Sequence, residues 1–215
     1  MISSLKQRVY DVQKKRQSGF TLIELLVTIT IFVVLTGVVL LSQNNFNNTI
    51  LLTNLSYDTA LTIRQAQTYG VNTRESSAGT FATSSGVYFD TTSGTGNKLS
   101  FILFADTNND QGSDINVNSC PANSTECIQK YSIKNGSYVR ALCAGTDSLH
   151  CFTTQKLDIL FTRPNPDALI YSQSGASGPI IFTTPQSYAQ ITVSSANGAT
   201  SSIIVTSVGQ IYVQK

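Results

Sequence analysis

The hydrophobic pattern divides the chain into a long apolar run, an amphipathic segment and a β-rich remainder. From Phe20 to Leu41 the chain runs for 22 residues with one charged side chain, Glu24. At about 1.5 Å per residue, a helix of this length spans the hydrocarbon core of a bilayer, which is about 30 Å thick. Because no water satisfies an open backbone there, the pattern predicts a transmembrane helix over 20–41.

Apolar periodicity returns after the polar, asparagine-rich stretch at 42–48. The positions that recur at spacings of three and four are Leu52, Leu55, Thr59, Ile63 and Ala66. This spacing places them on one face of a helix, whose second half can pack on a soluble domain. We therefore expect one helix from about Phe20 to about Tyr69, roughly 75 Å long, with Gly70 as its stop. The helical segment is taken as 20–70.

The remainder, 71–215, shows short alternating runs separated by turn residues, which predicts an antiparallel β domain and an α+β fold class. We expect 71–97 to be a surface connection with a short edge strand at 87–89. Further strands are predicted at 99–104, 157–161 and 180–182. Two hairpins are predicted, 130–142 around Asn135-Gly136 and 189–206 around Asn197-Gly198, with another turn at Gly209 before 211–213.

Charge is distributed very unevenly along the chain. Residues 1–19 carry five basic side chains against Asp11, a net charge of +4, whereas 20–215 carry nine basic and eleven acidic side chains, a net charge of −2. The cations Lys14, Lys15 and Arg16 precede the apolar run and predict a cytoplasmic N-terminal side. A simple signal anchor is one alternative. A secretory signal peptide fits less well, because no small-residue cleavage site follows the apolar run.

The stretch Ser18-Gly19-Phe20-Thr21-Leu22-Ile23-Glu24-Leu25-Leu26-Val27 resembles the class III leader and N-terminal helix of type IV pilins and type II secretion pseudopilins. The resemblance implies a prepilin peptidase that cuts the 1–19 leader between Gly19 and Phe20 and methylates the Phe20 amine. It also implies that Glu24 neutralises the N-terminal amine of a neighbouring subunit, since two charges that are costly alone in an apolar bundle are tolerated as a pair.

The order of the predicted elements is similar to that of GspH/FimT-like minor pilins and pseudopilins. The similarity implies a pilin fold, in which a curved β domain packs on the C-terminal half of the long helix, and a subunit that initiates or caps a filament. Implied partners are other pilins or pseudopilins, met through the N-terminal helix, and an inner-membrane assembly platform. The implied location is single-pass in the inner membrane, with the globular domain outside the cytoplasm, and then the pilus or pseudopilus.

A binding module at the tip of a DNA-uptake or adhesive pilus is the alternative function. Some FimT-like pilins bind DNA through arginines near the C-terminus, but this chain has only Lys215 beyond Gly209. The net charge of 20–215 also provides no general attraction for phosphate. Lys130, Lys134 and Arg140 could form a local basic patch, although such cations usually form a solvated face. The sequence therefore argues against nucleic acid as the partner.

The acidic stretch 106–114 allows two interpretations. Asp106, Asn108 and Asp110 have the spacing of the first oxygen ligands in a calcium-binding loop. The glycine then comes one residue late, and Val117 occupies the position of the bidentate glutamate. Asp and Asn after a strand also form ordinary turns by bonding their own backbone. We favour the turn and keep calcium as the one cofactor candidate.

Four cysteines lie within 120–151, namely Cys120, Cys127, Cys143 and Cys151. Their gaps are longer than those of zinc knuckles, and disulfides suit an exported domain. Four cysteines allow three pairings. We favour pairing of neighbours, which would close two loops, while crossed or nested pairing and free thiols stay open.

No catalytic constellation is visible. His150 is the single histidine, and Cys151 beside it would point to the other face of a strand. No glycine-rich phosphate loop joins a strand to a helix. Three classes remain, a filament subunit, a tip binding module and an anchored β domain that does not polymerise, and none of them is an enzyme.

Overall fold

The computed structural model describes residues 19–72, 82–92, 97–110, 112–113, 120, 126–173 and 185–214, apart from the side chains of 41–45 and 97. The chain divides into two compact units, Met1–Gln43 and Asn44–Lys215. Helix α1, Leu22–Val71, contributes to both units. It contains the single long helix that the apolar periodicity predicts, and the polar stretch at 42–48 does not interrupt it.

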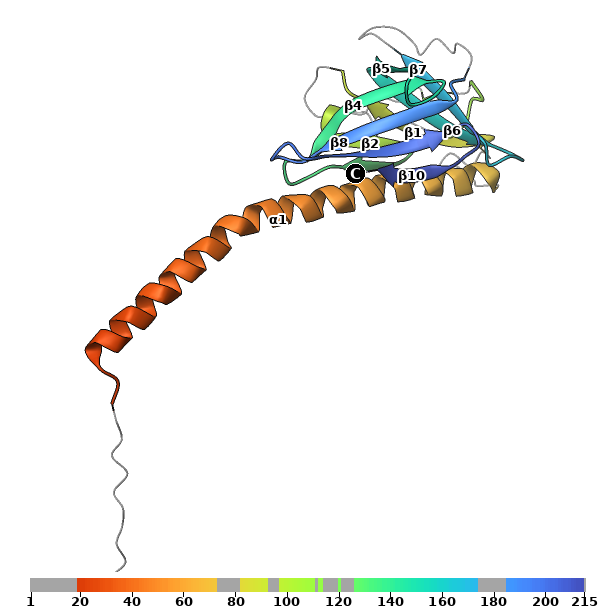
Figure 1. Ribbon diagram of the computed structural model, residues 1–215. Coiled ribbons are helices and arrows are strands. Elements are labelled where there is room, and N and C mark those ends of the chain that lie inside the picture. Colours follow the sequence, from red (N-terminus) through yellow and green to blue (C-terminus); the bar gives the residue numbers. More distant parts are fainter. Residues whose placement is uncertain are drawn as a thin grey trace, which may run out of the picture. The chain divides into compact units, whose positions relative to one another are not determined.

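In the second unit, one face of α1 is buried. Leu52, Thr59, Ile63 and Ala66 are each less than a tenth exposed, and Leu55 packs against the same core. These are the positions at which the sequence places the apolar face, so that prediction is confirmed. Figure 1 shows this part of α1 running beside strand β10 and below the sheets.

The described residues form ten strands in two five-stranded antiparallel sheets. The first sheet has the order β3-β2-β1-β6-β7 and the second has the order β10-β9-β8-β4-β5. The strands are β1 Ser84–Asp90, β2 Ser100–Asp106, β3 Cys127–Ser132, β4 Tyr138–Gly145, β5 Cys151–Thr154, β6 Lys156–Thr162, β7 Ala168–Gln173, β8 Tyr188–Ser194, β9 Thr200–Thr206 and β10 Ile211–Gln214, with a short 3-10 helix, Asn97–Leu99, before β2.

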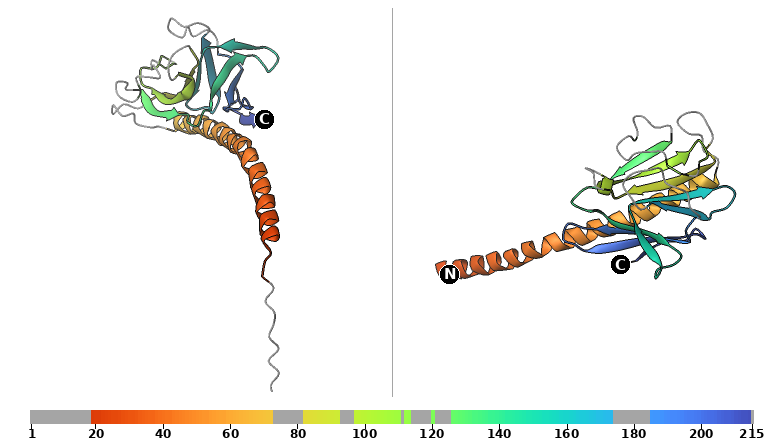
Figure 2. Two further views of the ribbon diagram at one scale, coloured as in Figure 1. Left: turned by 90° about the vertical axis from the view of Figure 1, so that its left-hand side faces the viewer. Right: turned by 90° about the horizontal axis from the view of Figure 1, so that it is seen from above.

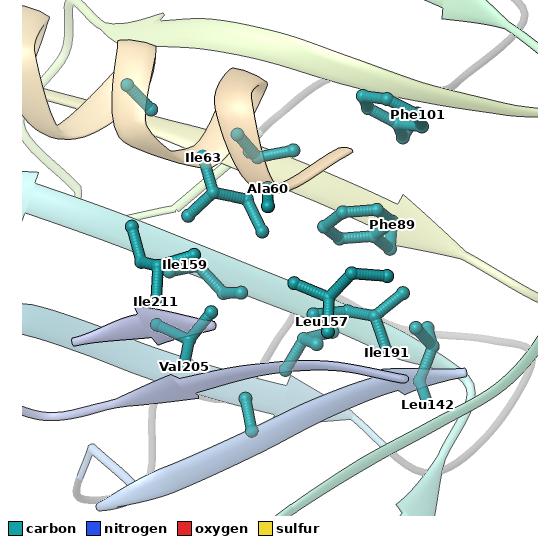
Figure 3. Packing of buried hydrophobic residues seen from close by; sticks show 14 of the residues in the cluster. Ala60, Ile63, Phe89, Phe101, Leu142, Leu157, Ile159, Ile191, Val205 and Ile211 are labelled. Carbon is teal, nitrogen blue, oxygen red and sulfur yellow. The ribbon is translucent and has the colours of Figure 1, made fainter. Parts of the chain in front are cut away.

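The main core is enclosed by the two sheets and α1. Seen from above, β1 to β3 lie on one side of the helix and β8 to β10 on the other (Figure 2). Ile63 from the helix, Phe89 and Ile159 from the first sheet, and Ile191 and Val205 from the second are all fully buried in this core (Figure 3). The model therefore has the predicted α+β class, a long N-terminal helix with an antiparallel β domain.

The helix ends at Val71, within a residue of the end predicted at Gly70, although Gly70 itself is helical. Gly70 is buried, and a Cβ atom there would overlap the main-chain carbonyl of Phe161 in β6. The glycine is therefore needed for close approach of the helix to a strand and not for a left-handed turn.

The predicted hairpin at 130–142 is wrong, although its turn is present. Asn135 and Gly136 both have positive φ, 62° and 75°, as the Asn-Gly dipeptide predicts. The strands on either side do not pair with each other, because β3 pairs with β2 in the first sheet and β4 pairs with β5 and β8 in the second. The turn carries the chain from one sheet to the other.

The prediction of an edge strand at 87–89 is also wrong. Strand β1 is the central strand of the first sheet, paired with β2 and β6, and all seven of its residues are buried. The strand-like run is short, and the position of a strand within a sheet depends on partner strands far along the chain. The local sequence therefore did not indicate a central strand. The strand expected at 180–182 lies outside the described residues.

The C-terminal hairpins follow the predicted pattern. Strands β8 and β9 pair around the Asn197-Gly198 turn, where Gly198 has φ 85°. Strands β9 and β10 pair around Gly209, whose φ is 77° and whose N–H donates to Thr206 O at 2.9 Å. Both glycines occupy the left-handed region that other L-residues rarely adopt.

Candidate functional site at the start of the long helix

Thr21 is the N-cap of α1. Its side-chain oxygen accepts a hydrogen bond from the Glu24 N–H at 3.3 Å, and its carbonyl accepts from the Leu25 N–H at 3.1 Å. Thr-Leu-Ile-Glu also has the S/T-x-x-E form of a capping box. Sequence reasoning missed this role of Thr21, although that four-residue pattern was a sufficient signal for it.

Gly19 and Phe20 precede the helix and are exposed. Helix α1 begins at Leu22, so the Gly19–Phe20 peptide bond is non-helical, and the Phe20 side chain is 79% exposed. A peptide bond outside regular structure can enter the extended cleft of a peptidase without unfolding of a helix. The predicted cleavage position is therefore sterically accessible.

Glu24 occupies the third position of the helix, inside its first turn. Free N–H groups at a helix start give this end a partial positive charge, which stabilises a nearby carboxylate. Glu24 is the only charged side chain in the segment 19–57, so it has no cation on its own helix nearby. A cationic partner for Glu24 would come from outside that segment.

The segment Leu22–Leu40 is long and apolar enough to cross a membrane, with a mean hydropathy of 2.6 and none of its residues buried by the rest of the chain. Its threonine hydroxyls are hydrogen-bonded within the helix. Thr28 donates to Leu25 O at 2.9 Å, and the hydroxyls of Thr30 and Thr36 make equivalent bonds at 2.8 Å to the carbonyls four residues earlier. These bonds leave Glu24 as the main polar group of the segment.

The predicted calcium residues lie in the second unit, at the end of β2. Asp106 is fully buried, and its Oδ1 accepts from the Asn109 N–H at 2.6 Å. Asn108 Oδ1 accepts from the Asp110 N–H at 3.2 Å, and Asp110 Oδ1 accepts from the Gly112 N–H at 3.1 Å. All three side chains thus bond the loop backbone, as expected of turn formers. Among the described residues, no group of three or more His, Cys, Asp or Glu side chains is placed to hold a metal ion.

Two disulfides join neighbouring cysteines. Cys120 pairs with Cys127, and both are buried in an apolar cluster on the outer face of the first sheet. Cys143 pairs with Cys151 and links β4 to β5. This is the pairing that the sequence analysis favours, and it leaves Cys151 without a free thiol for chemistry.

The loop closed by the second disulfide presents an exposed surface. Asp147 Oδ1 accepts the backbone N–H groups of Leu149 and His150 at 2.8 and 2.9 Å, and its Oδ2 lies 2.9 Å from His150 Nδ1. The side-chain bond with His150, followed by these backbone bonds, lowers the pKa of Asp147 to about 2. Leu149 and Phe152 are 89% and 74% exposed. We call Leu149, in this loop, and Phe152, in β5 directly after Cys151, the apolar loop tip.

The three cations of the possible basic patch lie on separate elements. Lys130 belongs to β3 of the first sheet, Lys134 precedes the Asn-Gly turn, and Arg140 belongs to β4 of the second sheet. Lys134 and Arg140 are exposed. Because the predicted hairpin does not form, the strand pairing that would have aligned these cations is absent.

Asp158 is a buried acid that sequence reasoning treated only as part of a strand. It lies in β6, directly opposite Tyr88 of β1 and Tyr171 of β7, and its exposed fraction is 0%. Neither carboxylate oxygen has a hydrogen bond of normal geometry among the described residues, although the Ser113 backbone lies near enough to favour the charged form. The signal was present in the sequence, as a single charge inside an apolar strand.

Burial raises the pKa of Asp158 well above its ordinary value, and the negative charges of Asp110 and Glu126 raise it further. Lys156 acts weakly in the opposite direction. Burial also raises the pKa of Tyr88, with added contributions from Asp90 and Asp158. The outer face of the first sheet therefore holds a carboxyl group whose pKa is raised by its surroundings.

A family model described as Prokaryotic N-terminal methylation motif matches residues 14–40. The match covers the cations, the Gly19–Phe20 bond, the cap and the apolar segment. No curated protein and no solved structure matches the chain. The motif supports a type IV pilin-like protein, a class of structural subunit that is processed by a prepilin peptidase and assembles with other pilins.

Proposed function

We propose that the chain is a minor pilin or pseudopilin, a structural subunit that initiates or caps a type IV pilus or a type II secretion pseudopilus. The observation that carries the proposal is the methylation motif at 14–40, which coincides with an exposed cleavage position and a capped apolar helix. The motif alone accounts for a pilin-like subunit. The minor role is supported by the succession of helix and strands that resembles GspH/FimT-like subunits.

The start of the helix supports a specific assembly chemistry. Cleavage after Gly19 would create an amine on Phe20, four residues before Glu24. Within one chain, Glu24 lies about one helical turn from its own N-terminus. A neighbouring copy can bring a second amine close to Glu24. Pairing of Glu24 with the amine of a neighbour would neutralise two charges that are each costly in hydrocarbon.

Mass spectrometry of filaments sheared from the native host, compared with the membrane fraction, tests the proposal. A form that starts at N-methylated Phe20, present in trace in the sheared fraction or only in the membrane, is the result expected of a minor pilin or pseudopilin. Abundance in the sheared fraction would identify a principal subunit and overturn the minor role. An uncut chain would overturn the filament function itself.

The apolar loop tip supports a second candidate, a binding module of an adhesive pilus. Leu149 lies in a loop that a disulfide closes and that Asp147 orders, and Phe152 lies in β5 directly after that disulfide; both side chains are exposed. Exposed apolar side chains on a rigid loop are typical of contact sites. A Leu149→Ser and Phe152→Ser double variant that assembles normally but no longer holds cells on a polystyrene surface would favour this function. Unchanged retention would argue against it.

A further inference from the structure

The sequence has two Asn-Gly dipeptides, Asn135-Gly136 and Asn197-Gly198, and both lie in exposed turns. Asn135, Gly136 and Gly198 have positive φ values of 62°, 75° and 85°. The two turns are also close together, since a Cβ atom on Gly136 would lie 3.0 Å from the Cβ atom of Ala196. They therefore share their exposure to solvent and differ mainly in their hydrogen bonds.

An Asn-Gly dipeptide carries its own electrophile and nucleophile. The side-chain amide carbon of the asparagine and the backbone nitrogen of the next residue can join to form a five-membered ring. Glycine at the second position has no Cβ atom to hinder this approach. Ring closure requires rotation of the asparagine side chain and of the peptide plane, so hydrogen bonds that hold either group oppose it.

Both reacting groups are held at Asn197-Gly198. The Gly198 N–H donates to Ser195 O at 3.0 Å, which fixes the nucleophile. The Asn197 Oδ1 accepts from the Ser195 hydroxyl and from the Ala199 N–H, which fixes the electrophile. The Ser195 N–H also donates to Ala199 O at 2.9 Å and closes the turn. Ring closure at this site would therefore break several hydrogen bonds.

Neither reacting group is held at Asn135-Gly136. In the part of the chain that the structure describes, no hydrogen bond involves the Asn135 side chain or the Gly136 N–H. The bond that closes this turn runs from the Ser137 N–H to Lys134 O at 3.4 Å, which is longer than the usual value of about 2.9 Å. The amide carbon and the backbone nitrogen can therefore approach each other without breaking a bond of their own.

We propose that Asn135-Gly136 deamidates spontaneously in the folded protein, whereas the fold protects Asn197-Gly198. After losing its proton to hydroxide, the Gly136 nitrogen attacks the Asn135 Cγ atom. A C–N bond forms, the bond from Cγ to the side-chain nitrogen breaks, and ammonia leaves with a proton from water. Water then opens the resulting succinimide at either carbonyl carbon, giving aspartate or isoaspartate. The net reaction consumes water and releases ammonia, with no change in oxidation state.

Deamidation would change the charge of a groove on the second unit. Asn135 lines a groove of about 280 Å³ between α1 and the turn, together with Asp58 and Lys134. Asp58 and Lys134 carry opposite charges, so a carboxylate at position 135 would make the groove net negative. Isoaspartate would also lengthen the main chain within the turn that joins the two sheets, directly after buried Ile133. The modification site therefore lies where both charge and chain path are sensitive.

Peptide mapping by mass spectrometry tests the proposal on the full chain, kept folded in detergent at pH 8. We expect Asn135 to deamidate at least about ten times faster than Asn197 in the same sample, because ring closure at Asn197 must first break two or more hydrogen bonds. In urea the two sites should react at similar rates. Absence of reaction at Asn135 in the folded protein, equal rates there, or a ratio that persists in urea would overturn the proposal.

Two variants test the cause of the difference. Ser195→Ala removes the hydroxyl that donates to Asn197 Oδ1, so deamidation at Asn197 should become faster by about two- to tenfold, with the rate at Asn135 unchanged. An unchanged rate at Asn197 would overturn protection by the fold. Asn135→Gln would require a larger ring, so the modification at position 135 should be lost while Asn197 reacts as before.

Hydroxylamine provides a second readout, because it cleaves a chain at a succinimide. Added to the folded protein during incubation, it should cut between Asn135 and Gly136. The Asn135→Gln variant should stay uncut at this position. Cleavage of the variant to the same extent, or cleavage of the unaltered protein only between Asn197 and Gly198, would overturn the proposal.

Discussion

Gly70 of α1 lies against the main-chain carbonyl of Phe161 in β6, so closely that a Cβ atom cannot be accommodated. Phe161 is fully buried, and its backbone is fixed by pairing with both β1 and β7. The strand therefore cannot move aside, and the helix must shift if a side chain is added. This one contact sets how closely the helix approaches the first sheet.

Gly70→Ala should destabilise the protein by about 1–3 kcal/mol, the usual cost of overpacking a core. Thermal denaturation of the full chain in detergent measures the change. Gly37→Ala is the matched control, because a Cβ atom at Gly37 meets nothing within 4 Å. Equal melting temperatures for the two variants would contradict the close approach at Gly70.

Glu24→Ala should leave cleavage at Gly19 intact and weaken filament assembly, because the N-terminal amine of a neighbour would lose its counter-charge. Immunoblotting of cell and sheared fractions follows both steps. Thr21→Ala serves as a comparison, since loss of the N-cap destabilises the start of the helix by about 1 kcal/mol without removing the charge. Normal assembly of Glu24→Ala would remove the pairing argument.

Asp158→Asn should make the protein more stable at pH 8 by more than about 1 kcal/mol. Burial raises the pKa of Asp158, so the folded state holds its proton at pH values where the unfolded state has released it. The stability of the unaltered protein therefore falls as pH rises above the ordinary Asp pKa, about 3.9, toward the raised value. At pH 4 and below, the advantage of the variant should disappear.

Urea denaturation between pH 4 and pH 8 measures this dependence. Asp167→Asn, the same exchange at an exposed loop residue, should change stability by less than about 0.5 kcal/mol. A gap between Asp158→Asn and the unaltered protein that stays constant with pH would show that ionisation of Asp158 is not the cause.

Replacing Cys143 and Cys151 together by alanine should lower the free energy of unfolding by about 2–3 kcal/mol, because a crosslink over eight residues restricts the unfolded chain. Replacing Cys120 and Cys127 should cost more, since both cysteines are buried in the outer apolar cluster and their loss also leaves space. Denaturation under non-reducing conditions compares the two. A larger loss of stability on replacing Cys143 and Cys151 would contradict the greater burial of Cys120 and Cys127.

The turn interpretation of 106–110 predicts that millimolar Ca²⁺ leaves the melting temperature unchanged. The side-chain oxygens of Asp106, Asn108 and Asp110 already accept backbone hydrogen bonds, so a cation would have to displace them. A ligand that binds only the folded state raises stability, by about 2.7 kcal/mol at one hundred times its Kd. A rise with Ca²⁺ that Asp110→Asn abolishes would establish the calcium site instead.

Local signals in the sequence were sufficient for the helix and for the C-terminal hairpins. The spacing of Leu52, Ile63 and Ala66 follows the helix period, and Gly198 and Gly209 supply backbone conformations that few other residues adopt. The division into two sheets could not be predicted in this way. The Asn135-Gly136 turn forms as expected, but the pairing of the strands around it is decided by partners far along the chain.

The candidate site shows the same contrast. Gly19, Phe20 and Glu24 lie within six residues of one another in the sequence, so a motif can identify them together. Asp158 has a distinctive environment only because β1 and β7 place Tyr88 and Tyr171 on either side of it. Nothing local to Asp158 specifies those neighbours, and its burial depends on the assembled sheet.

The internal hydrogen bonds of Thr28, Thr30 and Thr36 have a consequence for transfer between environments. A segment whose hydroxyls are already satisfied exchanges no hydrogen bonds when it leaves lipid and enters a bundle of helices. For this segment, lipid and a bundle of helices then differ mainly in how the side chains pack and in what surrounds the Glu24 carboxylate. The segment would therefore suit both roles that the proposed function gives it, membrane anchor and filament element, without a change of its own conformation.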